Sequence, residues 1–169
     1  MNKRKNGGKS GKNRVKNMVG LSVLAASALG VAMPAALAQS VNCFQTMIFG
    51  SIIPCAGGGT VSIDPAGTRT TGGCISVTGP SARGRCLLVG SFFPIRPMQV
   101  SITAPTFTIT NGTANMNVNG FDLSTAGNGP TITITSFIAT VNIGATLNVG
   151  ANQAPGNYSG TATINVNYQ

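Results

Sequence analysis

The chain has 169 residues, with eleven Lys and Arg, two Asp and Glu, and no His. Seven of the cations precede residue 17, and past that point only four Arg and two Asp remain. Such a shortage of titratable groups argues against an enzyme, because general acid–base catalysis needs positioned acids and bases. Four Arg without any Trp also do not provide the basic groove and aromatic platforms that bind nucleic acid.

The N-terminal segment has the order of a secretory signal, with basic residues over 2–16, an apolar run over 18–33 and then Ala36-Leu37-Ala38. The apolar run of about 16 residues is shorter than the ~20 that a membrane-spanning helix needs. The sequence therefore predicts a signal peptide over 1–38, recognised through Ala36 and Ala38 and cleaved before Gln39. The chain would then contact a membrane only during export. An uncleaved N-terminal anchor is the alternative.

Residues 39–169 form one predicted domain, long enough to bury about two-thirds of its unfolded surface. Because charged side chains are so few, the surface must be built from Thr, Asn, Ser, Gly and backbone. A surface with little net charge promotes association. The composition therefore favours a subunit that packs against copies of itself.

All four cysteines, Cys43, Cys55, Cys74 and Cys86, lie in the predicted exported part. An even number in a secreted chain predicts two disulfides, for which three connectivities exist. The equal spacings within the two local pairs, and the turn around Gly79-Pro80, favour Cys43–Cys55 with Cys74–Cys86. A four-cysteine metal site would need pairs separated by two to four residues. The chain has no such pair, so neither a metal nor another cofactor is expected.

Apolar and polar residues alternate along the exported part, which sends one set of side chains to a core and the other to solvent. In chain order, the alternating runs cover 100–104, 106–110, 115–119, 131–135, 141–143, 147–149 and 161–168. Turns rich in Gly and Pro separate these runs, and Asn111-Gly112 predicts a hairpin. About nine or ten short strands with regular turns predict an all-β fold, built as a single antiparallel β-sandwich.

The remaining polar side chains suggest no catalytic centre. Hydrolysis by Ser normally needs a His base, and the chain has none. Asp64 and Asp122 lie at positions typical of turns. Arg83 and Arg85 are interpreted as solvated loop charges, with an anion site as the alternative. The Thr-x-Thr runs are interpreted as solvent faces of strands, with an ice-binding surface as the alternative.

The C-terminal segment combines a turn with an alternating strand. Gly156-Asn157-Tyr158-Ser159-Gly160 leads into a run that ends at the last residue but one. Such a strand closes a sheet of its own domain or pairs with another chain by strand addition. The residues expected to form this strand and to carry assembly are Tyr158, Ala162, Ile164, Val166 and Tyr168.

Five short motifs follow one another along the chain, at 49–52, 58–61, 69–73, 100–105 and 151–160. In this order they resemble the secreted bacterial family called domain of unknown function 4402, over about residues 47 to 169. The ending is also similar to that of the spore coat protein U family and of chaperone–usher pilins. Those proteins close with a Gly-x-Tyr turn and an alternating strand that ends in Tyr.

The resemblance implies an immunoglobulin-like, pilin-like sandwich, exported to the periplasm, the outer surface or the surroundings of a Gram-negative bacterium. The implied partners are copies of the chain or related surface subunits, together with a periplasmic chaperone and an usher. Pilins of that type borrow a missing strand from a neighbour's N-terminal extension. Here only residues 39–48 precede Phe49, and they include Cys43.

The predicted function is therefore that of a non-enzymatic exported structural protein, a pilus-like or coat subunit that assembles through strand edges. The alternative is a self-complete secreted β-sandwich that serves as a binding or adhesion module.

Overall fold

The computed structural model describes residues 39–124 and 129–169. The predicted signal peptide, with Ala36 and Ala38, lies outside these residues. The described chain contains strands and no helix, so the expected all-β class is confirmed. The strands are β1 (Ser40–Gln45), β2 (Ser51–Ile53), β3 (Gly59–Ile63), β4 (Arg69–Gly73), β5 (Ser76–Thr78), β6 (Gly84–Val89), β7 (Met98–Ile102), β8 (Phe107–Thr110), β9 (Asn115–Ser124), β10 (Thr131–Ile134), β11 (Ile138–Val149) and β12 (Ile164–Tyr168).

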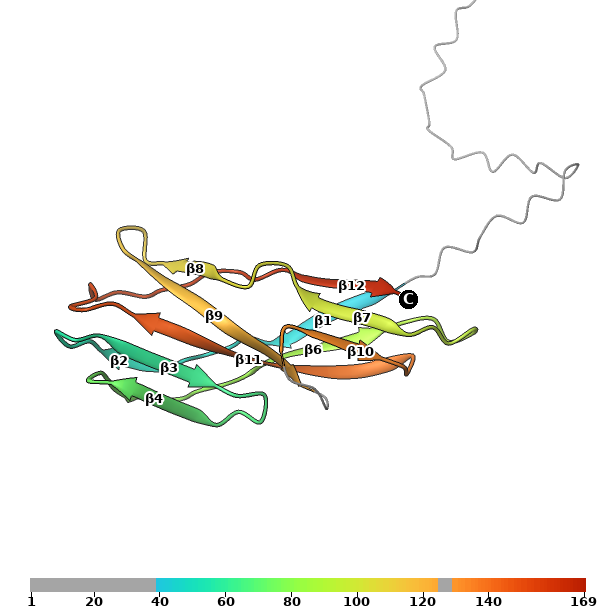
Figure 1. Ribbon diagram of the computed structural model, residues 1–169, viewed down its shortest axis with the longest axis horizontal. Coiled ribbons are helices and arrows are strands. Elements are labelled where there is room, and N and C mark those ends of the chain that lie inside the picture. Colours follow the sequence, from blue (N-terminus) through green and yellow to red (C-terminus); the bar gives the residue numbers. More distant parts are fainter. Residues whose placement is uncertain (1–38, 125–128) are drawn as a thin grey trace, which may run out of the picture. The chain divides into compact units, whose positions relative to one another are not determined.

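The larger sheet is organised around β11, the twelve-residue strand that crosses the centre of Figure 1. The first half of β11 pairs with β6 and the second half with β3. Strand β9 pairs with β11 from residue 142 to residue 148. Strand β1 extends the sheet beyond β6, β4 extends it beyond β3, and β8 extends it beyond β9. Every pairing is antiparallel.

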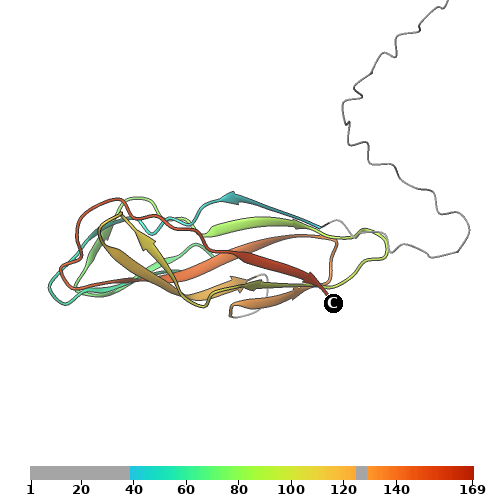
Figure 2. The same cartoon turned by 90° about the horizontal axis from the view of Figure 1, so that it is seen from above.

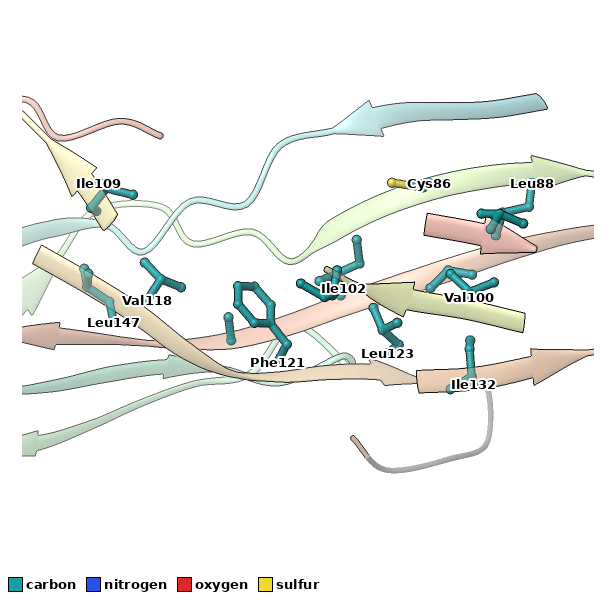
Figure 3. Close-up of a cluster of buried hydrophobic side chains, with 14 of the residues drawn as sticks. Cys86, Leu88, Val100, Ile102, Ile109, Val118, Phe121, Leu123, Ile132 and Leu147 are labelled. Carbon is teal, nitrogen blue, oxygen red and sulfur yellow. The ribbon is translucent and has the colours of Figure 1, made fainter. Parts of the chain in front are cut away.

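A second sheet of three strands, in the order β10-β7-β12, lies against the larger one, and β2 pairs with β5 in a short ladder. Figure 2 shows the layers from above. The core between them takes side chains from both sheets, as Figure 3 shows for Leu88, Leu123 and Leu147 of the larger sheet and Val100 and Ile132 of the smaller one. The fold is thus an antiparallel β-sandwich.

Alternation in the sequence accounts for most of these strands. In β7, Met98, Val100 and Ile102 are buried and the residues between them are half-buried. The predicted hairpin is confirmed, since β8 pairs with β9 across Asn111-Gly112. Its turn is closed by the Asn111 carboxamide oxygen, which accepts the amides of Thr113 at 3.0 Å and Ala114 at 2.7 Å.

Two predicted boundaries were wrong. The segments 141–143 and 147–149 belong to one continuous strand, β11. Gly144 keeps this strand unbroken, because a Cβ there would lie 2.6 Å from the Ile63 carbonyl oxygen of the neighbouring strand. The last strand begins at Ile164 and not at Thr161, so residues 160–163 run beside the sheet without joining it as a strand.

A bulge in β9 reverses which residues face the core. The register of β9 against β11 shifts between Asn119 and Asp122, and Gly120 adopts a positive φ of 59°. A glycine with this backbone conformation is typical of a β-bulge. Before the bulge, Met116 and Val118 point inward, whereas after it Phe121 and Leu123 do. The extra residue therefore brings the Phe121 ring into the core.

The expected disulfide pairing was wrong, although all four cysteines are bonded. The bonds are Cys43–Cys86 and Cys55–Cys74. Gly79-Pro80 does not join two paired strands, because β5 pairs with β2 whereas β6 pairs with β1 and β11. Cys43 and Cys86 are direct partners in the β1–β6 register. The pairing thus follows long-range strand contacts, which local spacing does not encode.

Peptide mapping without reduction tests this pairing. Cleavage after Arg69, Arg83 and Arg85 places Cys43 and Cys55 in one peptide, Cys74 in a second and Cys86 in a third. We expect the first peptide to be bonded to both others, because both observed disulfides leave it. A bond between the second and third peptides alone would contradict the structure. Further cleavage at Phe44 and Phe49 separates Cys43 from Cys55 and distinguishes the remaining connectivity.

Candidate functional site

A groove opens between two segments that are far apart in the sequence, the one that follows β1 and the one that precedes β12. It consists of two adjoining cavities of about 420 and about 470 Å³. Both cavities are lined by Met47, Phe49, Ile109 and Tyr158, so they form one continuous trough. Core side chains form its floor, among them Ile102, Phe121 and Ile143 in one cavity and Met116, Leu147 and Val149 in the other.

The floor is apolar and stiff. Phe107, which is half-buried, stacks on the buried Phe121 with ring centroids 5.7 Å apart. The bulge at Gly120 is what turns Phe121 toward this position. The trough therefore runs over core side chains that are themselves at most 8% exposed.

The two walls are formed mainly by segments within 46–54 and 153–162, and the edge strands β1 and β12 add only Cys43, Gln45 and Ile164. β1 is the last strand at one end of the larger sheet, and β12 is the last strand at one end of the smaller sheet. The Gln39 side-chain amide donates to the Val166 carbonyl oxygen at 2.7 Å and links the two walls. Beyond this link, the amides of residues 160–163 donate no hydrogen bond to the described part of the chain. Edges of this kind offer backbone groups to an added strand.

Three of the five C-terminal residues selected from the sequence lie at this groove. Tyr158, Ala162 and Ile164 line it. Val166 belongs to the core, and Tyr168 is half-buried opposite Met98 of β7. The Tyr158 hydroxyl donates to the Ala154 carbonyl oxygen at 2.7 Å, which fixes the turn that closes one end of the trough.

The opposite wall is fixed covalently. β1 pairs with β6 from Ser40 onward, and the Cys43–Cys86 disulfide lies within that ladder. Cys43 itself borders the groove. The segment that the pilin resemblance would make a free donor is therefore bonded into its own domain.

The two carboxylates serve local structure. The Asp64 carboxylate accepts the Thr68 amide at 2.7 Å within the β3–β4 turn, as its position in the sequence suggested. Asp122 lies in β9 and accepts the Gly129 amide at 3.0 Å. No group of three or more His, Cys, Asp or Glu side chains gathers within the described ranges.

The interpretation of Arg83 and Arg85 as solvated loop charges was wrong for Arg85, which is a half-buried residue of β6, and incomplete for Arg83, which precedes β6 and makes a defined contact. Arg83 donates to the Pro65 carbonyl oxygen at 2.8 Å. The Arg85 guanidinium lies over the Phe44 ring at 5.1 Å from its centroid, within the range of a cation–π contact. Both side chains thus tie neighbouring segments together.

Sequence reasoning identified one wall of the groove and missed the rest. Its floor is made of ordinary core positions from β7, β8, β9 and β11, and alternation predicts only that such residues face inward. Whether a strand covers them depends on strand order, which the sequence pattern does not show.

The model of the family described as domain of unknown function (DUF4402) matches residues 40–168. The chain belongs to this family, as the motif order indicated. No curated protein and no solved structure matches the chain. Among the described residues there is no helix of the length and hydrophobicity needed to cross a membrane.

The Asp64 turn predicts a pH dependence of stability. The Thr68 amide, as the largest cause, holds the pKa of Asp64 below its usual value. A carboxyl whose pKa is lower in the folded state stabilises the fold fully above its unfolded-state pKa, about 3.9. This contribution is lost as the pH falls through the folded-state pKa.

Chemical denaturation of the wild-type chain and of Asp64→Asn at neutral and acidic pH checks this point. We expect the difference in unfolding free energy between the two chains to shrink as the pH falls below about 4. A difference that stays constant down to pH 2 would contradict the role assigned to the carboxylate.

Proposed function

We propose that this member of the domain-of-unknown-function family is a non-enzymatic, exported structural protein, a pilus-like or coat subunit that assembles through strand edges. The open groove carries the proposal, because it combines an apolar floor with walls that continue from the edge strands β1 and β12. Its occupant is an extended segment of another subunit of the same assembly. The two disulfides fit an oxidising compartment such as the periplasm or cell surface.

Strand addition satisfies both features of the groove at once. The backbone of an added strand bonds to free edge groups, while every second side chain enters the apolar trough. Burying one large aliphatic or aromatic side chain contributes about 1.5–3 kcal/mol. Several such side chains, buried one after another along the groove, offset the entropy lost on association.

The donor segment is not β1 of an identical copy while Cys43–Cys86 is intact, because exchange would require that strand to leave β6. The fitting donor is an extended segment of a related surface subunit, or a stretch outside β1 in a further copy. Strand addition to the groove is also compatible with two further partners. These are a periplasmic chaperone that covers the groove before assembly and an usher that organises assembly. Neither a cofactor nor a nucleic acid is part of the proposal.

One observation favours the second candidate function, a self-complete binding or adhesion module. β1 is paired within its own domain and covalently bonded there. In that case the groove would bind an extended ligand and no polymer would form.

Light scattering after size-exclusion chromatography, together with electron microscopy, distinguishes the two functions. The chain is exported with its own N-terminal segment, alone and with related subunits, and purified without reduction. We expect assemblies to form and Ala162→Arg to abolish them, because a guanidinium would occupy the groove that Ala162 lines.

Thr133→Arg is the matched control, since Thr133 is exposed on β10 away from the groove lining. Both variants should unfold within about 1 kcal/mol of the wild type. A monomer under every condition would contradict assembly, and assemblies that tolerate Ala162→Arg would contradict the groove as the site of assembly.

A further inference from the structure

One end of the sandwich carries an exposed apolar cluster that the groove does not involve. In the loop between β6 and β7, the side chains of Phe92, Phe93 and Ile95 are 71%, 89% and 53% exposed. Ile138, at the start of β11, is 46% exposed. We call Phe92, Phe93, Ile95, Phe137 and Ile138 the aromatic tip. In Figure 1 its main loop projects past the C-terminus.

The aromatic tip is held in place by the body of the domain. The Gly90 amide donates to the Phe137 carbonyl oxygen at 2.6 Å. The Phe92 and Phe137 rings meet edge to face, with centroids 5.0 Å apart. At the other end of the loop, the Gln169 amide donates to the Pro97 carbonyl oxygen at 2.9 Å. Because the loop is already fixed, little conformational entropy is lost when it binds.

The aromatic tip has a cationic side chain beside it, because Arg96 is exposed in the same loop. The two carboxylate side chains of the described chain both accept hydrogen bonds from backbone amides elsewhere, Asp64 in the β3–β4 turn and Asp122 beside Gly129. An apolar projection with a guanidinium beside it complements a surface that is apolar inside and anionic outside.

The aromatic tip also lies where the described chain begins. Ser40 pairs with Val89, the last residue of β6 before the exposed loop, and Tyr168 pairs with Met98 just after it. The segment predicted to take the chain through a membrane during export is thus joined to the domain at this end.

We propose that the aromatic tip inserts into the headgroup region of a bilayer that contains anionic lipid, with Arg96 at the phosphates. The aromatic tip projects and has no groove of its own, so it suits a soft apolar medium better than a flat protein surface. This proposal goes beyond the assembly function and does not rest on it. It also departs from the expectation that the chain meets a membrane only during export.

The test uses the absence of Trp from the chain, which makes an introduced indole the only one. Phe93→Trp and, as control, Ile53→Trp are exported, purified and mixed with vesicles of phosphatidylcholine alone or with phosphatidylglycerol. Ile53 is 62% exposed on β2, outside the aromatic tip. We expect a blue shift of emission for Phe93→Trp only, and a larger one with the anionic lipid.

Co-sedimentation supplies a second readout. The fraction of protein bound to anionic vesicles should fall by about tenfold or more in Phe93→Ser, because the aromatic ring proposed to enter the bilayer is lost. It should be unchanged in Ile53→Ser. In Arg96→Gln, the preference for anionic over neutral vesicles should shrink.

Three results would overturn the proposal. The first is the absence of any blue shift with either vesicle, and the second is an equal shift for Ile53→Trp, which indicates general adsorption. The third is a shift that grows with protein concentration in the absence of vesicles, together with a higher mass by light scattering. That result would make the aromatic tip a contact between protein chains. None of them bears on the groove, which Ala162→Arg tests separately.

Discussion

The backbone hydrogen bonds of β11 place every other strand of the larger sheet, directly or through one neighbour. This strand bonds along one side to β6 and then β3, and along the other to β9. It runs without a break because Gly144 lets the Ile63 carbonyl approach closely. With β11 at the centre, β1 becomes an outermost strand of the larger sheet, and β12 is an outermost strand of the separate smaller sheet. The open groove between them is a consequence of this strand order.

The Cys43–Cys86 disulfide limits which part of the chain can take part in the proposed assembly. Cys43–Cys86 fixes one wall by holding β1 against β6. The same bond prevents that wall from serving as a donor elsewhere. The proposed subunit thus accepts a strand of another subunit in its groove, while its own first strand, β1, remains paired with β6 of the same domain. The main loop of the aromatic tip is held by hydrogen bonds at both of its ends.

The sequence was sufficient for the fold class and for one wall of the groove. Strict alternation around Val100 and Ile132, and the turn at Asn111-Gly112, required antiparallel strands. The disulfide pairing could not be predicted, because Cys43 and Cys86 meet through strand order and not through spacing. The inward position of Phe121 depends on the bulge at Gly120, which shifts the alternation by one residue. The sequence also did not predict the exposure of Phe93, because an apolar residue in a loop is as easily buried as exposed.

Hydrogen exchange at the amides of residues 160–163 tests the central claim most directly. Residues 160–162 line the groove, and the amides of residues 160–163 donate no hydrogen bond to the described chain, so these amides should exchange quickly in the isolated subunit. In the assembled protein, an added strand should protect them strongly, while amides at the β3–β4 turn stay unchanged. Protection that is already complete in the isolated subunit, or that does not change on assembly, would contradict an open groove filled by a neighbouring chain.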